Sequence, residues 1–193
     1  AGTHGKTTTS SLVAHLSKEA NLPFSAFLGG IAENFKSNFL FNGSEISVVE
    51  ADEYDRSFLN LSPDWAAITS TDADHLDIYG DKATIEQGFR DFANLIPSDQ
   101  QLFVRKGINI GRPAKTYAVN EEADYYSDNI REIGDKIYFD FHTPTEEIAD
   151  FEWEIPGIHN VENATVAIAI LHNLGVDFET LKRAIANFKG IKR

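Results

Sequence analysis

Apolar residues recur at helical spacing in four segments of the chain. They lie three and four residues apart and predict helices over residues 6–20, 84–95, 159–174 and 178–188. Pro23, Pro97, Gly175 and Gly190 follow these segments at the distances typical of helix ends. Within the second segment, we expect Leu95 to face the core together with the other apolar residues.

Short apolar runs between the helices predict strands. The runs in 45–50 (EISVVE) and 65–69 (WAAIT) lack polar alternation, which is typical of strands buried in a parallel sheet. Asn42-Gly43 predicts a hairpin that joins residues 38–41 to 45–50. Gly29-Gly30 predicts a turn within the apolar run 24–31. Further short strands are predicted over residues 102–104, 116–119, 125–130, 137–141 and 151–155.

The order of these elements predicts an α/β fold in a single domain over residues 1–193. We expect a P-loop-type, mostly parallel sheet flanked by helices. The polar alternation in 125–130 and 137–141 adds a small antiparallel β subsheet, half exposed to solvent.

Composition narrows the range of partners. The chain has 17 Lys and Arg against 30 Asp and Glu, and the resulting net charge of −13 argues against nucleic acid and anionic membranes as partners. It has no cysteine, which excludes disulfides and thiolate metal sites and fits a cytoplasmic location. No run of 18 apolar residues and no signal peptide is present in the sequence.

The first nine residues, AGTHGKTTT, have the character of a phosphate-binding loop. Gly2 and Gly5 permit a tight turn that brings backbone N–H groups and a helix N-terminus close to an anion. Lys6 would reach the β- and γ-phosphates of a nucleotide, and the Thr7 hydroxyl would hold Mg²⁺. The strict pattern has a further glycine before residue 1, so we expect the strand that leads into the loop to lie outside the chain.

A chance Gly-Lys-Thr at the start of a helix is the alternative interpretation of this loop. Lys6 itself is expected to be an exposed loop residue. Its replacement by alanine should then remove nucleotide binding and leave the fold intact.

Two polar clusters follow the two buried strands, where open α/β sheets bind ligands. Glu50 ends the first strand, and we favour it as a Mg²⁺ ligand over an ordinary loop acid. Asp52 stays open between these two roles. His75 lies in the second cluster, DADHLD at 72–77, and could be a metal ligand, a phosphate contact or a helix cap.

A third cluster opens the helix predicted over 159–174. His159, Asn160 and Asn163 offer an imidazole and two amides, which can stack on a purine and hydrogen-bond to it. Helix capping is the simpler interpretation when these residues are considered alone.

Together these motifs resemble the Mur ligase family of cytoplasmic peptidoglycan enzymes. AGTHGKTTT (1–9), EADEYDRSFL (50–59), DADHLDIYG (72–80) and GIHNVENA (157–164) stand in that family's order and at similar spacing. The resemblance covers essentially the whole chain as the central ATP-binding domain, with the N-terminal UDP-binding and C-terminal amino-acid-binding domains outside it. It is nearest to the member that joins L-alanine to UDP-N-acetylmuramate, the two substrates that it implies.

The resemblance implies that ATP phosphorylates the muramoyl carboxylate and that the alanine amine attacks the acyl phosphate. Lys6 would hold the transferring phosphate, Thr7 and Glu50 would bind one Mg²⁺, and His75 would help to hold a second. Lys6, Glu50 and His75 would thus carry the catalysis. The resemblance assigns nucleotide contacts to Gly2, Thr3, His4, Gly5, Lys6, Thr7 and Thr8 of the loop, and to His159, Asn160 and Asn163 at the adenine.

Two positions separate the chain from the nearest member. Tyr54 follows EADE, where a related ligase that recycles murein tripeptide commonly has tyrosine, so that ligase is the second interpretation. Arg193 matches either of two adjacent arginines in the family and receives no role. Another P-loop phosphotransferase and a non-catalytic nucleotide-binding fragment are the remaining alternatives, and the sequence does not indicate an oligomeric state.

Overall fold

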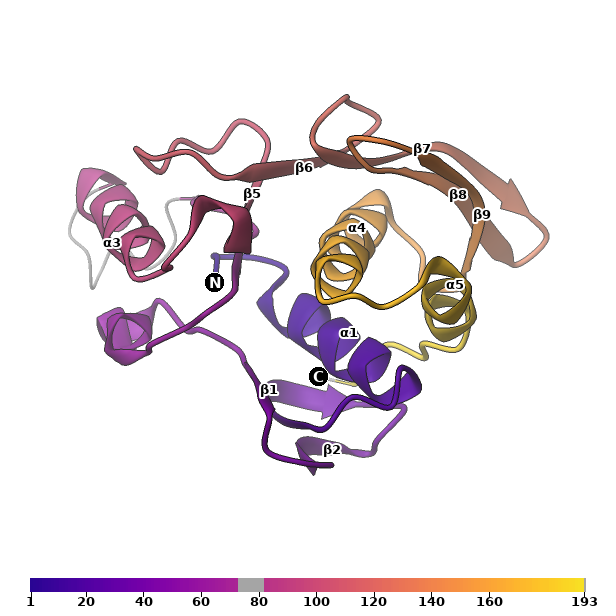
Figure 1. Ribbon diagram of the computed structural model, residues 1–193, viewed down its shortest axis with the longest axis horizontal. Coiled ribbons are helices and arrows are strands. Elements are labelled where there is room, and N and C mark those ends of the chain that lie inside the picture. The colour runs from indigo at the N-terminus through magenta and orange to yellow at the C-terminus, as the bar shows by residue number, and fades with distance from the viewer. Residues whose placement is uncertain (73–81, 193) are drawn as a thin grey trace. The chain divides into compact units, whose positions relative to one another are not determined.

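The computed structural model describes residues 1–72 and 82–192 and confirms the α/β fold class (Figure 1). The chain forms two compact units. Ala1–Lys6 and Ala51–Tyr117 make up the first unit, and Thr7–Glu50 and Ala118–Arg193 make up the second.

The first unit contains a parallel ladder covered by one long helix. Ala66 pairs with Leu102 and Phe103 pairs with Lys115, so three successive strands run in the same direction. Phe58 stacks on Phe92 at a centroid distance of 5.0 Å and closes the apolar core. The elements of this unit are η1 (Tyr54–Asn60), β4 (Ala66–Ile68), α3 (Lys82–Asn94), η2 (Asp99–Gln101), β5 (Leu102–Arg105) and the start of β6 (Lys115–Val119).

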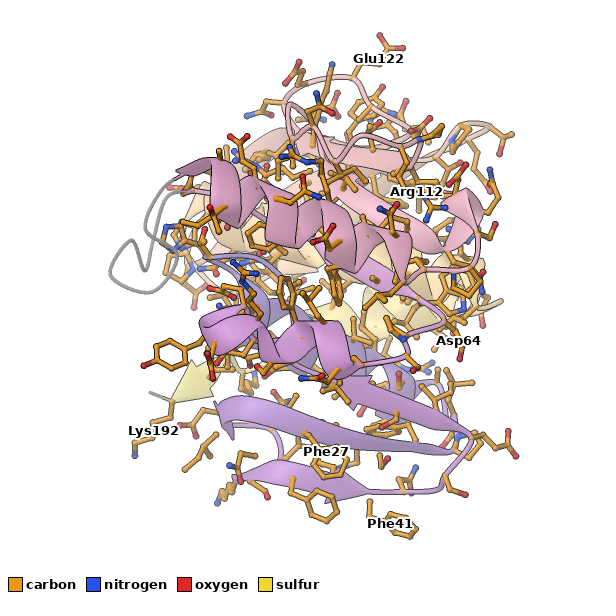
Figure 2. All side chains as sticks on the ribbon, turned by 90° about the vertical axis from the view of Figure 1, so that its left-hand side faces the viewer. Phe27, Phe41, Asp64, Arg112, Glu122 and Lys192 are labelled. Atoms are coloured by element: carbon orange, nitrogen blue, oxygen red, sulfur yellow. The ribbon has the colours of Figure 1, made fainter. Side chains whose placement is uncertain are left out.

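The end of α3 departs from the sequence expectation. Leu95 is 37% exposed, whereas Ile96 is buried in its place, so the prediction that Leu95 faces the core is wrong. The reason is that the chain tightens here: the Leu95 and Ile96 N–H groups bond to carbonyls three residues back, which changes the side-chain directions. Arg112, labelled in Figure 2, donates to the carbonyls of Ala93 and Ile96 at 3.0 Å each.

The second unit contains a sheet centred on β1 (Phe24–Ala32). Ala26 and Leu28 belong to an apolar cluster with Ala14 of α1 (Lys6–Glu19), while Phe27 and Phe41 project from the other face (Figure 2). The strands that pair with β1 are β2 (Ser37–Phe41) and β10 (Ile191–Lys192), both antiparallel, and β3 (Ile46–Val49), which is parallel.

The hairpin predicted about Asn42-Gly43 is wrong. Residues 25–27 of β1 pair with β2 on one side and with β3 on the other, so β1 lies between the two strands that were expected to pair. The connection crosses the start of β1, where the Asn42 N–H donates to Phe24 and the Ile46 N–H donates to Pro23. Tertiary pairing with β1 therefore overrides the local turn signal.

The turn predicted at Gly29-Gly30 is also wrong, because both glycines lie inside β1. The pairing of β1 with β2 shifts register between Phe27 and Ala32, which places the glycines at an irregularity of the strand. A glycine within a strand commonly marks a close approach of another group to the backbone.

The rest of the second unit is an antiparallel meander packed against two helices (Figure 1). Trp153 is fully buried and stacks on Phe188 at 5.8 Å. All these elements confirm predictions: β7 (Tyr125–Ile133), β8 (Lys136–His142), β9 (Glu147–Trp153), α4 (Ile158–Asn173) and α5 (Phe178–Ala186). In the part of the chain that the structure describes, no helix has the length and apolar character needed to cross a bilayer.

Candidate functional site

The first unit holds the glycine loop at the end of β4. The Ala1 amino group donates to the Ala67 carbonyl at 2.8 Å, and the Thr69 N–H donates to the Ala1 carbonyl at 3.0 Å. This alternation is that of a parallel ladder, so Ala1 lies alongside β4. Gly2, with φ of +138°, follows so closely that a Cβ would fall 2.2 Å from the Thr69 hydroxyl oxygen. Only glycine fits at this point of the loop.

Ser70 fixes the middle of the loop. Its hydroxyl accepts the His4 N–H at 2.7 Å and shares a hydrogen bond of 2.8 Å with the Thr3 hydroxyl. The His4 N–H is therefore directed at Ser70, while Gly5, with φ of +82°, turns the chain into α1. The predicted phosphate loop is thus anchored to the carboxyl end of a parallel strand, where α/β sheets bind ligands.

Lys6 forms an ion pair with Glu53 in the first unit. Its ammonium donates to both carboxylate oxygens of Glu53, at 2.8 and 2.7 Å. The Lys6 side chain is 15% exposed and that of Glu53 only 1%, while Asp52 stands on the exposed side at 4.0 Å. Glu53 was not among the candidates from the sequence, although it lies in the EADE motif.

The expectation that Lys6 is an exposed loop residue is therefore wrong. Lys6 is the first residue of α1 and compensates a carboxylate that is almost completely buried. Removing one partner of a buried ion pair generally costs about 3–5 kcal/mol, because the other charge stays buried. We accordingly expect Lys6→Ala to reduce the stability of the fold as well as any anion binding.

Glu50 occupies a separate cradle in the second unit. Its carboxylate accepts the Thr7 hydroxyl at 3.0 Å and the Gly29 N–H at 2.8 Å. A Cβ on Gly29 would lie 2.5 Å from Oε2 of Glu50, whereas a Cβ on Gly30 would touch the Thr7 methyl at 3.1 Å. Glu50 and Thr7 thus lie so close to β1 that a Cβ at either position would meet them, which explains glycine inside this strand.

The Glu50 site offers oxygen ligands of the kind that a hard cation prefers. The Thr7 hydroxyl and the Glu50 carboxylate supply two adjacent oxygen ligands, which is the chemistry that Mg²⁺ prefers. Residues 1–72 and 82–192 contain no cluster of three His, Asp or Glu side chains able to hold a metal ion. The remaining predicted metal ligand, His75, lies outside the described residues.

The start of α4 does not show the side-chain helix capping that was the alternative to a nucleotide contact. Gly157 occupies the N-cap with φ of +97° and gives no side-chain cap bond, while the Asn160 amide donates to the Pro156 carbonyl at 2.6 Å. Asn163 is buried, and its Oδ1 accepts the Thr9 hydroxyl at 3.3 Å. His159 is exposed. The amides are thus placed by contacts other than capping, and Asn163 is tied to α1.

The first unit also contains a cavity lined in part by Ser70. This cavity has a volume of about 500 Å³ and lies at the carboxyl ends of β4 and β5. Its wall begins at Ser70, the residue that holds the loop. Its other lining residues are Thr71, Asp72, Glu86, Arg90 and Arg105 to Asn109. A polar substrate group would find room there.

Of the remaining candidates, Thr8 is buried in the first turn of α1. The structure thus brings the loop to Glu53 in the first unit, and Thr7 to Glu50 and Gly29 in the second. Sequence reasoning missed both Glu53 and Gly29. The available signal for Gly29 was a glycine pair inside an apolar strand run, which can indicate close approach as well as a turn.

A glycine loop that opens a helix beside parallel strands defines a P-loop-type α/β domain. Comparison with known proteins narrows this class: the model of the Mur ligase middle domain matches residues 1–171, and the chain belongs to that family. The UDP-N-acetylmuramate--L-alanine ligases of Christiangramia forsetii and Flavobacterium psychrophilum are 48% and 46% identical to the whole chain. The chain spans 42% and 43% of their lengths, less than half of each.

Solved structures give the same family. The UDP-N-acetylmuramate-alanine ligase MurC of Thermotoga maritima matches the whole chain with a TM-score of 0.86 at 27% identity, over 44% of its own length. The UDP-N-acetylmuramate:L-alanyl-gamma-D-glutamyl-meso-diaminopimelate ligase of Neisseria meningitides follows with a TM-score of 0.85 at 27% identity, over 65% of that chain.

Proposed function

We propose that this chain is the ATP-binding domain of a ligase that joins L-alanine to UDP-N-acetylmuramate through an acyl phosphate, for peptidoglycan precursor synthesis in the cytoplasm. The observation that carries the proposal is the identity of 48% and 46%, over the whole chain, to ligases that bear this name. The anchored phosphate loop and the Glu50 cradle supply the matching chemistry.

The proposed reaction brings together two anions, a carboxylate and a triphosphate, and the residues present address that repulsion. The Lys6 ammonium would contact the transferring phosphate and stabilise the charge that develops on its oxygens. The positive end of α1 and backbone N–H groups of the loop other than that of His4, which bonds to Ser70, would hold the remaining phosphates. His159, Asn160 and Asn163 would bind the adenine.

Thr7 and Glu50 would hold Mg²⁺, which supplies further positive charge at the phosphates when bound. We propose His75 as a ligand of a second Mg²⁺ near the substrate carboxylate. Lys6, Glu50 and His75 would together be the catalytic groups of this domain.

The test is a calorimetric titration of the chain and of Lys6→Ala with ATP in excess Mg²⁺. We expect the chain to bind ATP and the variant to lose at least tenfold in affinity, which corresponds to about 1.4 kcal/mol. Equal affinities would refute the phosphate-loop assignment. Since Lys6 is also structural, circular dichroism must first establish that the variant is folded at the temperature used.

A second measurement tests the reaction itself. We expect the chain alone to form no amide from UDP-N-acetylmuramate, L-alanine and ATP, because the named relatives have more than half of their length outside the matched region. Amide formation by the isolated chain would contradict this expectation.

The murein tripeptide ligase is the second candidate, because Tyr54 follows EADE and the Neisseria meningitides ligase matches with nearly the same TM-score. Competition separates the two candidates. In a complete ligase that contains this domain, phosphate release in the presence of UDP-N-acetylmuramate should depend on L-alanine and not on the tripeptide. The reverse dependence would favour the recycling enzyme.

A further inference from the structure

We propose that Glu53 is a positioning residue that holds the Lys6 ammonium in place for the terminal phosphates of ATP. The inference rests on the proposed function and deepens it. It concerns a residue that the phosphate-loop pattern does not contain, since Glu53 lies 47 residues further along the chain than Lys6.

The geometry of the pair is the first support. An ammonium has three N–H donors, and Glu53 accepts from Lys6 with both of its oxygens, at 2.8 and 2.7 Å. Two bonds from one carboxylate fix the position of Nζ more closely than a single bond, because they restrict rotation about the carbon chain of the lysine. A lysine is otherwise among the side chains with the most rotamer freedom.

The second support is the rigidity of Glu53 itself. The Arg56 N–H donates to the Glu53 carbonyl at 3.0 Å, and the Phe58 N–H donates to the Asp52 carbonyl at 3.1 Å. The Phe58 ring is 1% exposed and packs between rings of α3, stacked on one and edge-on to the other. The carboxylate is therefore attached to the core of the first unit through the turn that follows it.

The third support is burial. Glu53 is 1% exposed, so water does not replace the lysine as its partner without opening the structure. The pair is thus expected to stay together when phosphate oxygens approach, and Lys6 would bind them from the position that Glu53 sets. A residue that merely competed with phosphate for Lys6 would be expected at the exposed rim, where Asp52 stands at 4.0 Å with 60% of its side chain exposed.

The experiment compares Glu53→Gln with the parent chain in calorimetric titrations with Mg–ATP and with AMP. AMP lacks the β- and γ-phosphates that Lys6 is proposed to contact. We expect Glu53→Gln to weaken ATP binding about tenfold and to leave AMP binding unchanged. A purely structural role would weaken both ligands to the same extent and would overturn the inference, as would unchanged or tighter ATP binding, which would make Glu53 a competitor.

Matched variants complete the test. Asp55→Asn makes the same change in charge two residues away at an exposed position, and asparagine tolerates the φ of +52° found there, so we expect ATP affinity within twofold of the parent. Glu53→Asp keeps the charge on a shorter side chain and should give a smaller loss for ATP alone. If Glu53→Gln does not fold, Glu53→Asp replaces it as the test variant. An unchanged ATP affinity in Glu53→Asp would then refute the positioning role.

A double-mutant cycle separates this inference from the proposed function. In a Lys6→Ala background, Glu53→Gln should have no further effect on ATP affinity, because the residue acts through the lysine. An additive loss would contradict this. If the parent chain binds neither ATP nor AMP, the proposed function fails; if it binds both and Glu53→Gln behaves like the parent, only the positioning role fails.

Discussion

Replacing Gly29 with alanine displaces Glu50 without removing any functional group from the site. The new Cβ would lie 2.5 Å from Oε2 of Glu50, whereas ordinary contact begins at 3.4 Å, so the carboxylate must withdraw by about 0.9 Å. The withdrawal would break the 2.8 Å bond from the Gly29 N–H and disturb the 3.0 Å bond from the Thr7 hydroxyl. The Glu50 carboxylate would then no longer lie next to the Thr7 hydroxyl in the position proposed to bind Mg²⁺.

We expect Gly29→Ala to weaken metal binding and to leave the free energy of unfolding nearly unchanged. The clash involves the end of a flexible side chain. Replacing glycine by alanine also lowers the conformational entropy of the unfolded chain, which by itself raises the free energy of unfolding by about 0.4–1 kcal/mol. One lost hydrogen bond offsets that gain by about 1 kcal/mol, so the free energy of unfolding should stay within about 1 kcal/mol of the parent. Displaced groups around a metal generally cost 10–100-fold in metal affinity, which we take as the expected range.

Calorimetry with ATP in Mg²⁺ and in EDTA measures this effect. Gly29→Ala should weaken ATP binding in Mg²⁺ by about tenfold or more. In EDTA the two proteins should bind ATP equally. In a Glu50→Ala background the glycine substitution should have no further effect, since the carboxylate that it would displace is gone.

Two outcomes would refute this reasoning. Equal Mg²⁺-dependent affinity of Gly29→Ala and the parent would show that the position of Glu50 is not important for the ligand. A loss of more than about 2 kcal/mol in urea unfolding would show that Gly29 has a structural role, contrary to the small change expected here.

Three further predictions concern other parts of the chain. Burial lowers the pKa of His15 below its ordinary value of 6.5 and outweighs the opposite effect of the 2.8 Å hydrogen bond between Nε2 and the Ala184 carbonyl, so the folded state favours the neutral ring. Its contribution to stability is therefore complete above pH 6.5 and lost as the pH falls below that value; in urea unfolding, the parent should lose more stability than His15→Gln between pH 7.5 and 5.5, and parallel losses would exclude the effect. Arg112→Lys should lower the free energy of unfolding by about 1–2 kcal/mol, because the compact ammonium lacks the planar fork of N–H groups by which Arg112 reaches Asp99 and the carbonyls of Ala93 and Ile96; an unchanged urea midpoint would contradict this. Asn163→Ala should weaken ATP more than inorganic triphosphate in calorimetric titrations, whereas equal losses would assign Asn163 to its bond with Thr9.

The helices and most strands of this chain can be predicted from local sequence. Residues 6–20 and 159–174 repeat apolar side chains at helical spacing, and the structure confirms them as α1 (Lys6–Glu19) and α4 (Ile158–Asn173). The run WAAIT likewise contains β4. These signals are local, because a helix or a buried strand needs only its own periodicity and composition to be recognised.

The motifs that identify the family are local in the same sense. The loop AGTHGKTTT is one contiguous stretch, and Glu50 directly follows the run ISVV. The match of the Mur ligase middle domain to residues 1–171 confirms the family that these motifs indicated. The roles of Lys6, Glu50 and His75 remain predictions, since they depend on a bound nucleotide.

The roles of Gly29-Gly30, Asn42-Gly43 and Glu53 depend on contacts between distant segments of the chain. Both glycine-containing pairs are turn signals by composition. Gly29-Gly30 nevertheless lies inside β1, where the Gly29 N–H donates to Glu50. The strands on either side of Asn42-Gly43 do not pair with each other, because β1 lies between them. Glu53 pairs with Lys6, which lies 47 positions away in the sequence. The physical reason is common to all three: the deciding contact joins segments that are distant in the chain, and neither propensity nor periodicity carries information about such a contact.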